Sequence, residues 1–148
     1  MLGEHFPAEE RQEYARRQYT PGRVLRLHVD FTKPPKLKRL VLVYVGQQPL
    51  VFLINSNIST YIRSKPDLSN CQVKLEVGKN SFLDHDSYLD CSNVFDNFSD
   101  KDILDAIASS PDAVQGELSK KTTRLILKVV KGAKSISPRH KQLIINSF

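Results

Sequence analysis

Four cationic side chains lie within seven residues of this chain, in the stretch KPPKLKR, and the apolar run LVLVYV follows them directly. They are Lys33, Lys36, Lys38 and Arg39. A guanidinium group can give a phosphate two parallel hydrogen bonds, whereas ammonium groups contact a nucleic-acid backbone by charge alone. We therefore predict a stiff basic loop that binds RNA, with Arg39 anchored by the buried strand that follows it. The alternative is that Arg39 is a solvated gatekeeper residue, whose charge protects the neighbouring apolar strand from aggregation.

Polar groups on two further segments could assist such a site. Arg26 and His28 alternate with apolar residues in the first predicted strand, so both belong to its polar face and could contact RNA. Histidine can act as a general base, although a single histidine on a strand is more often simply exposed. Asn55 and Ser56 follow the run LVFLI and could hydrogen-bond a phosphate or a base edge. Ordinary turn chemistry is the competing explanation for that pair.

The sequence shows no pattern typical of a metal centre. Residues 84–96 contain four aspartates, but their spacing matches no known cation-binding loop. Cys71 and Cys91 form no CxxC pair, and we expect both to be reduced, partly buried small side chains. We therefore predict neither a metal nor a cofactor.

Charge is divided along the chain into alternating blocks, although the formal net charge is only +6. Residues 21–65 carry eight Lys or Arg and one acid, whereas residues 66–117 carry three Lys and eleven acids. Residues 118–148 carry eight Lys or Arg and no acid. If the fold brings the two basic blocks together, they form a surface for a polyanion. Otherwise the three blocks neutralise one another across the surface.

The length of 148 residues, of which 40% are apolar, is typical of one domain with a modest core. No apolar run reaches the roughly 18 residues of a membrane helix, and the N-terminal stretch lacks a signal-peptide core. We therefore expect a cytoplasmic protein with no membrane partner. Residues 7–18 contain helix formers but no apolar stripe, which indicates a solvated helix or a mobile arm. We divide the chain into an N-terminal helical arm (1–20) and a barrel domain with C-terminal helices (21–148).

Period-two alternation and short apolar runs predict strands over much of residues 23–92. The expected strands cover 23–31, 40–45, 50–54, 71–77 and 87–91, and the buried face of the fourth holds Cys71, Val73, Leu75 and Val77. Proline lacks a ladder donor, so we expect KPPKLK to lie outside any central strand. This spacing favours a small, strongly bent antiparallel barrel in a mainly β protein. The runs 40–45 and 50–54 are apolar at both parities, which favours a homodimer that covers the surplus.

Three helices are expected after the strands. Ser99 and Asp102 form a capping-box pattern before a helix over 100–109. Ser119 begins a second helix, which ends near Gly132, and Ser137-Pro138 begins a short third one. The apolar face predicted for the second helix consists of Thr122, Leu125, Ile126 and Val129.

The order of these elements, together with several short motifs, resembles the MazF/PemK family of ribonuclease toxins. The first strand opens with Pro21-Gly22 and ends at Val29-Asp30-Phe31, and a basic loop with Arg39 precedes the next apolar strand. The third strand ends at Asn55-Ser56, and the stretch 114–119 is similar to the family's opening of its last helix. Two positions depart from the family pattern. Leu40 follows the arginine where the family has proline, and Asn55 replaces a threonine whose hydroxyl is one of the family's catalytic groups.

The resemblance implies an SH3-like barrel that acts as a homodimeric, metal-independent endoribonuclease toxin and is neutralised by a small acidic antitoxin. It implies catalytic roles for Arg39 and for Ser56 or Asn55, with attack by the RNA 2′-hydroxyl on the adjacent phosphorus. One alternative is a catalytically lapsed relative that uses the same barrel to bind nucleic acid or protein. A further alternative is an SH3-like adaptor that binds protein and not nucleic acid.

Overall fold

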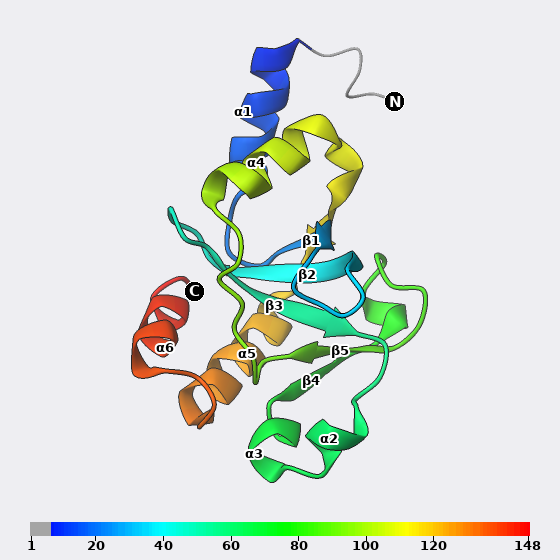
Figure 1. Cartoon of the computed structure of the whole chain (residues 1–148), viewed down its shortest axis with the longest axis vertical. Coiled ribbons are helices and arrows are strands. Elements are labelled where there is room, and N and C mark those ends of the chain that lie inside the picture. Colours follow the sequence, from blue (N-terminus) through cyan, green and yellow to red (C-terminus); the bar gives the residue numbers. More distant parts are fainter. Residues whose placement is uncertain (1–6) are drawn as a thin grey trace.

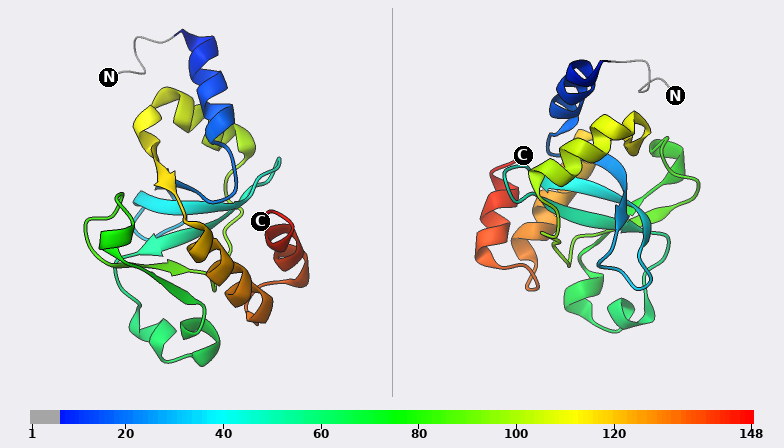
Figure 2. Two further views of the ribbon diagram at one scale, coloured as in Figure 1. Left: turned by 180° about the vertical axis from the view of Figure 1, so that it is seen from behind. Right: turned by 45° about the horizontal axis from the view of Figure 1, so that its top comes forward.

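The computed structural model describes residues 7–148, which form a small, mainly β protein with helices on both sides of one sheet (Figure 1). Six strands pair in the order β4-β5-β3-β2-β1-β6, and every pair is antiparallel. The strands are β1 (Arg23–Val29), β2 (Lys36–Tyr44), β3 (Leu50–Asn55), β4 (Gln72–Leu75), β5 (Ser87–Asp90) and β6 (Val114–Glu117). The sheet curls into a half-barrel, which agrees with the expected strongly bent antiparallel architecture (Figure 2).

The helices differ greatly in length. The longer ones are α1 (Ala8–Gln18), α4 (Asp100–Ser109), α5 (Lys120–Gly132) and α6 (Pro138–Ile145). The short ones are α2 (Thr60–Arg63), α3 (Pro66–Ser69) and the 3₁₀ turns η2 (Val77–Lys79) and η3 (Pro111–Ala113). No helix within residues 7–148 combines the length and the hydropathy that a membrane span requires.

Strand β2 lies near the middle of the sheet, and four consecutive side chains in it, Leu40 to Val43, are fully buried. Because strand side chains alternate, they enter two separate cores. Val41 and Val43 join a core that contains α5 and α6, on what we call the α5 face. Leu40 and Leu42 join a core that contains α1 and α4, on the α4 face.

Helix α4 covers the face that a lone sheet would leave exposed. Its Ile103 and Ile107 are fully buried against β1, β2 and β3. The Ser99–Asp102 capping box that starts this helix is present, as predicted. The chain thus covers both apolar faces of β2 by itself, so the apolar surplus that favoured a homodimer is absent within the described residues.

The predicted helix over residues 7–18 is confirmed by α1, but it is not a solvated arm. Ala15 is fully buried, and the half-buried Tyr14 packs in the core of the α4 face. A single small residue and one aromatic suffice for this contact, which explains why no apolar stripe is visible in the sequence. Residues 1–6 of the predicted arm lie outside the described residues.

The prediction that KPPKLK lies outside any central strand is wrong for its second half. The strand begins directly after the second proline, so the missing N–H groups do not affect it. Strand β2 begins at Lys36, directly after Pro35, and pairs with β1 from Val29↔Lys36 to Val24↔Val41. Residues after Pro35 again have N–H donors, and β1 needs a partner along its whole length. Lys36, Lys38 and Arg39 are therefore strand residues, and only residues 30–35 form the loop.

Strand β6 was not predicted. The stretch 114–119 was matched to the opening of the last helix, but residues 114–117 form an edge strand that pairs with β1 and contains Gln115. The pairing of β6 with β1 covers only three residue pairs and includes a register shift, so the sequence of β6 shows no period-two alternation. At the other edge, Val77 leaves the predicted buried face, because the chain turns into η2 and exposes 40% of that side chain.

Cys71 and Cys91 are free and buried, as expected. They face each other across the ends of β4 and β5, and the Cys91 N–H donates to the Cys71 carbonyl at 3.0 Å. Burial raises the pKa of both thiols, most strongly that of Cys91.

Helix α5 begins and ends where expected, but its buried stripe is rotated. Ile126 and Val130 are fully buried, whereas Leu125, which was predicted on the apolar face, is 43% exposed. The two neighbours Leu125 and Ile126 thus form a matched pair for measuring what burial on this helix contributes.

We expect Ile126→Ala to lower the free energy of unfolding by about 2–5 kcal/mol, because it removes buried methyl groups and leaves a cavity. Leu125→Ala should cost less than about 1 kcal/mol, because that side chain is half in water. Urea unfolding followed by circular dichroism would measure both. Equal costs for the two variants would contradict the orientation of α5.

Candidate functional site

A pocket of about 200 Å³ lies at the end of the sheet where β1 and β3 finish and β2 and β5 begin. Its polar lining includes Arg26, Arg39, Ser56, His85 and Ser87, with Leu83 and Ile54 as apolar wall. These polar residues continue, two positions at a time, the rows of apolar residues on the α5 face. The same alternation that buries Val41, Ile54 and Leu89 therefore aims Arg39, Ser56 and Ser87 toward the same side of the sheet.

Two arginines face each other in this pocket. Arg26 on β1 and Arg39 on β2 are direct cross-strand partners. Opposed residues of an antiparallel pair have Cβ atoms roughly 4.5–5.5 Å apart, and like charges in such positions destabilise a sheet. The fold therefore carries an electrostatic cost here that a bound anion would relieve.

The Arg39 guanidinium is held from two sides. Its Nε donates to Oε1 of Gln115 on β6 at 3.2 Å. Its Nη2 lies 3.7 Å from Oδ2 of Asp84, whose side chain is 85% exposed. An ion pair with so exposed a carboxylate contributes little. Gln115 thus fixes the orientation of the group, and Asp84 is readily exchanged for another anion.

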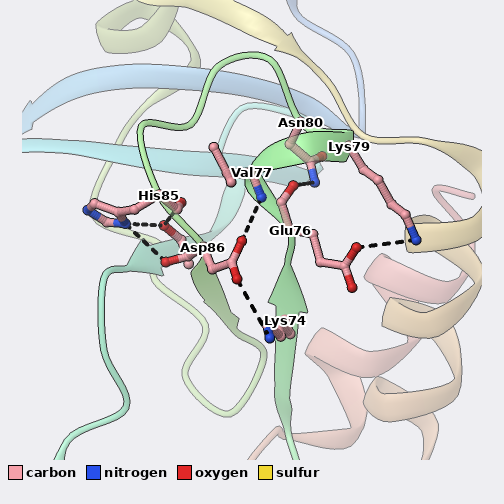
Figure 3. A network of polar contacts seen from close by, with 8 residues as sticks. Lys74, Glu76, Val77, Lys79, Asn80, His85 and Asp86 are labelled. Carbon is pink, nitrogen blue, oxygen red and sulfur yellow. Dashed lines mark hydrogen bonds and ion pairs between the residues drawn. The ribbon is translucent and has the colours of Figure 1, made fainter.

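The imidazole of His85 has a defined tautomer. Its Nδ1 lies 3.0 Å from the carbonyl oxygen of Asp86 and 3.3 Å from Oγ of Ser87, whose hydroxyl donates to the His85 carbonyl (Figure 3). A carbonyl oxygen can only accept, so Nδ1 carries the proton. In the neutral ring with this tautomer, Nε2 has the lone pair that can take a proton from a substrate.

Local hydrogen bonds hold the loop that presents His85. The carboxylate of Asp86 accepts from the Val77 N–H at 2.8 Å and lies 3.7 Å from Nζ of Lys74, and the Asn80 amide donates to the Glu76 carbonyl (Figure 3). Asp86 thus ties the start of β5 to η2. Across residues 7–148, no three His, Cys, Asp or Glu side chains gather closely enough to hold a metal ion.

Lys38 and Asn55 are in step with the residues of the α4 face, yet Lys38 also lines the pocket next to Arg39. The Lys38 ammonium donates to Oδ1 of Asn55 at 2.6 Å. Burial and, less strongly, the neighbouring charge of Lys36 lower the pKa of Lys38. A threonine at position 55 would therefore place its hydroxyl on the α4 face, whereas Ser56 is the hydroxyl that lines the pocket.

The remaining predicted residues are more peripheral. Lys33 lies exposed in the loop between β1 and β2, and Lys36 is an exposed residue at the rim of the pocket. His28 is exposed on the same face of β1 as Arg26 but does not line the pocket. The structure thus brings together five of the predicted residues and leaves Lys33, Asn55 and His28 outside; the five are Arg26, Lys36, Lys38, Arg39 and Ser56.

Three residues of the site were not predicted: His85, Ser87 and Gln115. His85 and Ser87 stand two apart before the buried Leu89, and this spacing could have identified them as neighbours on one face of the fifth strand. Their position in an acidic stretch obscured that pattern. No sequence pattern identified Gln115, because β6 is recognisable as a strand only from its pairing with β1 in the folded protein.

Comparison of the chain with models of known protein families finds no match, and no curated protein matches it.

A pH-dependent effect on stability should follow from the partly buried amine of Lys38. Because burial lowers the pKa of Lys38 from its ordinary 10.5, the unfolded chain binds more protons than the folded chain just below pH 10.5, and stability rises with pH there. Lys38→Met removes this contribution. We therefore expect the difference in unfolding free energy, variant minus wild type, to fall as pH rises from 8 to 10.5 in urea titrations.

The exposed Lys33 provides the control, since Lys33→Met should change stability by less than about 0.5 kcal/mol. A difference between Lys38→Met and wild type that grows with pH would show that the ammonium form of Lys38 is favoured by folding.

Proposed function

We propose that the protein is an endoribonuclease that cleaves RNA at the pocket between β1, β2, β3 and β5, without a metal ion. The observation that carries the proposal is the opposed pair Arg26–Arg39 in one pocket with Ser56 and His85. Two guanidinium groups match the charge and the bidentate geometry of a phosphodiester. A hydroxyl and an imidazole supply the groups that proton transfer needs.

The reaction starts with attack of the RNA 2′-hydroxyl on the adjacent phosphorus. His85 Nε2 takes the proton of that hydroxyl while the O2′–P bond forms and the P–O5′ bond breaks. The 5′-oxygen takes a proton from solvent through the Ser56 hydroxyl, and His85 later returns its proton to solvent. The products are a 2′,3′-cyclic phosphate and a 5′-hydroxyl.

Arg39 stabilises the charge that builds on the phosphoryl oxygens. Its orientation is set in advance by the Gln115 hydrogen bond and by the rigid β2 strand, which limits reorganisation during the reaction. Arg26 binds the same phosphate or the next one. Displacement of the exposed Asp84 carboxylate by the phosphate frees the second edge of the Arg39 guanidinium.

The order of elements supports an assignment to MazF/PemK-like toxins with an SH3-like barrel. An arginine in the second strand and a hydroxyl after the third strand share one pocket, which supports the resemblance noted above. The corresponding partners are RNA, a small acidic antitoxin and a second copy of the chain. Asn55 takes no part in this chemistry, and Ser56 replaces the hydroxyl of the family's threonine.

Purified protein should cut a long, unstructured RNA in the presence of EDTA and leave 2′,3′-cyclic phosphate ends, because the nucleophile belongs to the RNA. Gel electrophoresis and mass spectrometry of the fragments would measure both results. RNA of the same sequence with 2′-O-methyl groups should remain intact. Fragments with 5′-phosphate ends, or cleavage only after addition of Mg²⁺, would contradict the mechanism.

Arg39→Ala should reduce the cleavage rate about a hundredfold or more, the scale of losing a group that stabilises transition-state charge. Arg39→Lys should also be slow, because an ammonium group cannot make the planar bidentate contact. His85→Gln should lower the rate by about 10²–10⁴, the usual contribution of a general base. His140→Gln, on α6 outside the pocket, is the matched control and should keep the wild-type rate.

A full cleavage rate for His85→Gln would remove that residue from the mechanism. An inert wild type that still binds RNA would identify the barrel as a binding module whose catalysis has lapsed.

A further inference from the structure

The exposed face of α5 carries an uninterrupted row of cations. Lys120, Arg124, Lys128 and Lys131 recur at helical spacing, and Lys121 lies beside them. At about 100° per residue, the five side chains fall within roughly 100° of arc, and the row is roughly 16 Å long. All five residues are exposed. We call this set the α5 stripe.

Nothing in the described part of the chain neutralises the α5 stripe. None of its five members forms an ion pair with a carboxylate of residues 7–148. The first turn of α5 contains no acidic residue, although an acid there would favour the helix. Lys120, Arg124 and Lys128 are also like charges at i, i+4 spacing, which costs helix stability. The arrangement therefore suits an external anion better than it suits the helix itself.

The stripe begins beside a second hollow, which adjoins the candidate active pocket. This hollow of about 450 Å³ is lined by Lys79, Phe82, Ser119 and Lys120, among others, with Glu117 as its carboxylate. Phe82 lines it while the next residue, Leu83, lines the active pocket. Likewise Gly116 lines it while the preceding Gln115 holds Arg39. Two pairs of consecutive residues thus form the partition between the two hollows.

Gly116 permits this close arrangement. Its φ of 156° lies at the edge of the positive range that side chains rarely adopt, and the position where a Cβ would stand is in van der Waals contact with the Phe82 ring, at 3.4 Å. The absence of a side chain lets the 79–84 segment pack directly on β6. Figure 3 shows the Lys79 side chain, whose Nζ lies 3.3 Å from the Glu76 carboxylate, on the side of this segment where the yellow-brown chain leads into α5.

We propose that a single RNA strand bound at the active pocket continues through the Lys79–Lys120 hollow and along the α5 stripe. This inference deepens the proposed function, on which its choice of RNA over an acidic protein rests. The two basic blocks of the sequence, 21–65 and 118–148, contribute one end of the track each. Phe82 offers an aromatic ring for a base at the junction, and the cations of α5 bind successive phosphates.

The test uses a 2′-O-methyl oligonucleotide of about 20 nucleotides, which the wild-type protein can bind but not cleave by 2′-hydroxyl attack. The test variant carries Lys120→Glu, Lys121→Glu and Arg124→Glu. A control variant carries Arg16→Glu, Arg17→Glu and Lys101→Glu on α1 and α4, which lie on the other side of the sheet (Figure 2). Each set reverses three charges and changes the formal net charge from +6 to zero. The control also breaks the exposed ion pairs Arg17–Glu13 and Lys101–Asp105, so its folding is checked by thermal unfolding as well.

We expect the α5 variant to bind the oligonucleotide at least about tenfold more weakly in 0.1 M salt. Its log–log salt dependence should be shallower by about 2, at roughly 0.7 for each of three lost phosphate contacts. The control variant should bind as the wild type does. Glutamates in the first turn favour the helix, so thermal unfolding should show that the α5 variant remains folded.

Equal weakening of both variants, or of neither, would overturn the inference. Displacement of the oligonucleotide by poly-glutamate at matched charge concentration would also overturn it, and would identify an acidic protein as the ligand. Failure of the proposed function gives a different result. In that case no form of the protein cuts unmodified RNA, whereas the α5 variant alone still loses binding to the 2′-O-methyl strand.

Discussion

Strand β2 has four consecutive buried side chains, and each of them must leave water on one face of the sheet or the other. Full burial of such a side chain stabilises the folded state by roughly 1.5–3 kcal/mol, so neither face can remain open. The rest of the molecule follows from this constraint. Helices α5 and α6 cover one face, and α4 with α1 covers the other. The two cores share the sheet as a common wall, so β2 is held by buried side chains on both of its faces.

The candidate site uses this rigidity. Arg39 is two residues from Val41, on the same face and in the same strand, so its backbone cannot shift without disturbing both cores. A catalytic group gains most when its position is fixed before the substrate arrives. The Gln115 hydrogen bond extends that order to the guanidinium itself. Arg26 opposite Arg39 and the like charges along α5 both cost stability through repulsion. The two buried cores offset this cost.

The parity of the strands divides the polar residues into two groups with different surroundings. Residues in step with Val41 and Ile54 continue the α5 face, and residues in step with Leu40 and Leu53 continue the α4 face. Lys38 and Arg39 are adjacent in sequence and both line the pocket, but the Lys38 ammonium donates to Asn55 while the Arg39 guanidinium donates to Gln115. The charge block 33–39 is therefore not one loop, because Lys36, Lys38 and Arg39 line the pocket from β2 whereas Lys33 lies outside it.

The sequence by itself determined most of the antiparallel strands, the three C-terminal helices with their caps, the strand position of Arg26, and the places of Arg39 and Ser56 next to buried apolar runs. These features depend on local periodicity, capping chemistry and the pattern of apolar residues, all of which act over a few neighbours. Only the tertiary structure decided that α1 and α4 cover the second face of β2, that Gln115 lies on a sixth strand, and that His85 lines the same pocket as the arginines. Each of these depends on contacts between segments far apart in the chain, which local patterns do not encode. The rotation of the buried stripe on α5 has the same cause, because the faces of a helix rich in apolar residues are distinguished only by what packs against them.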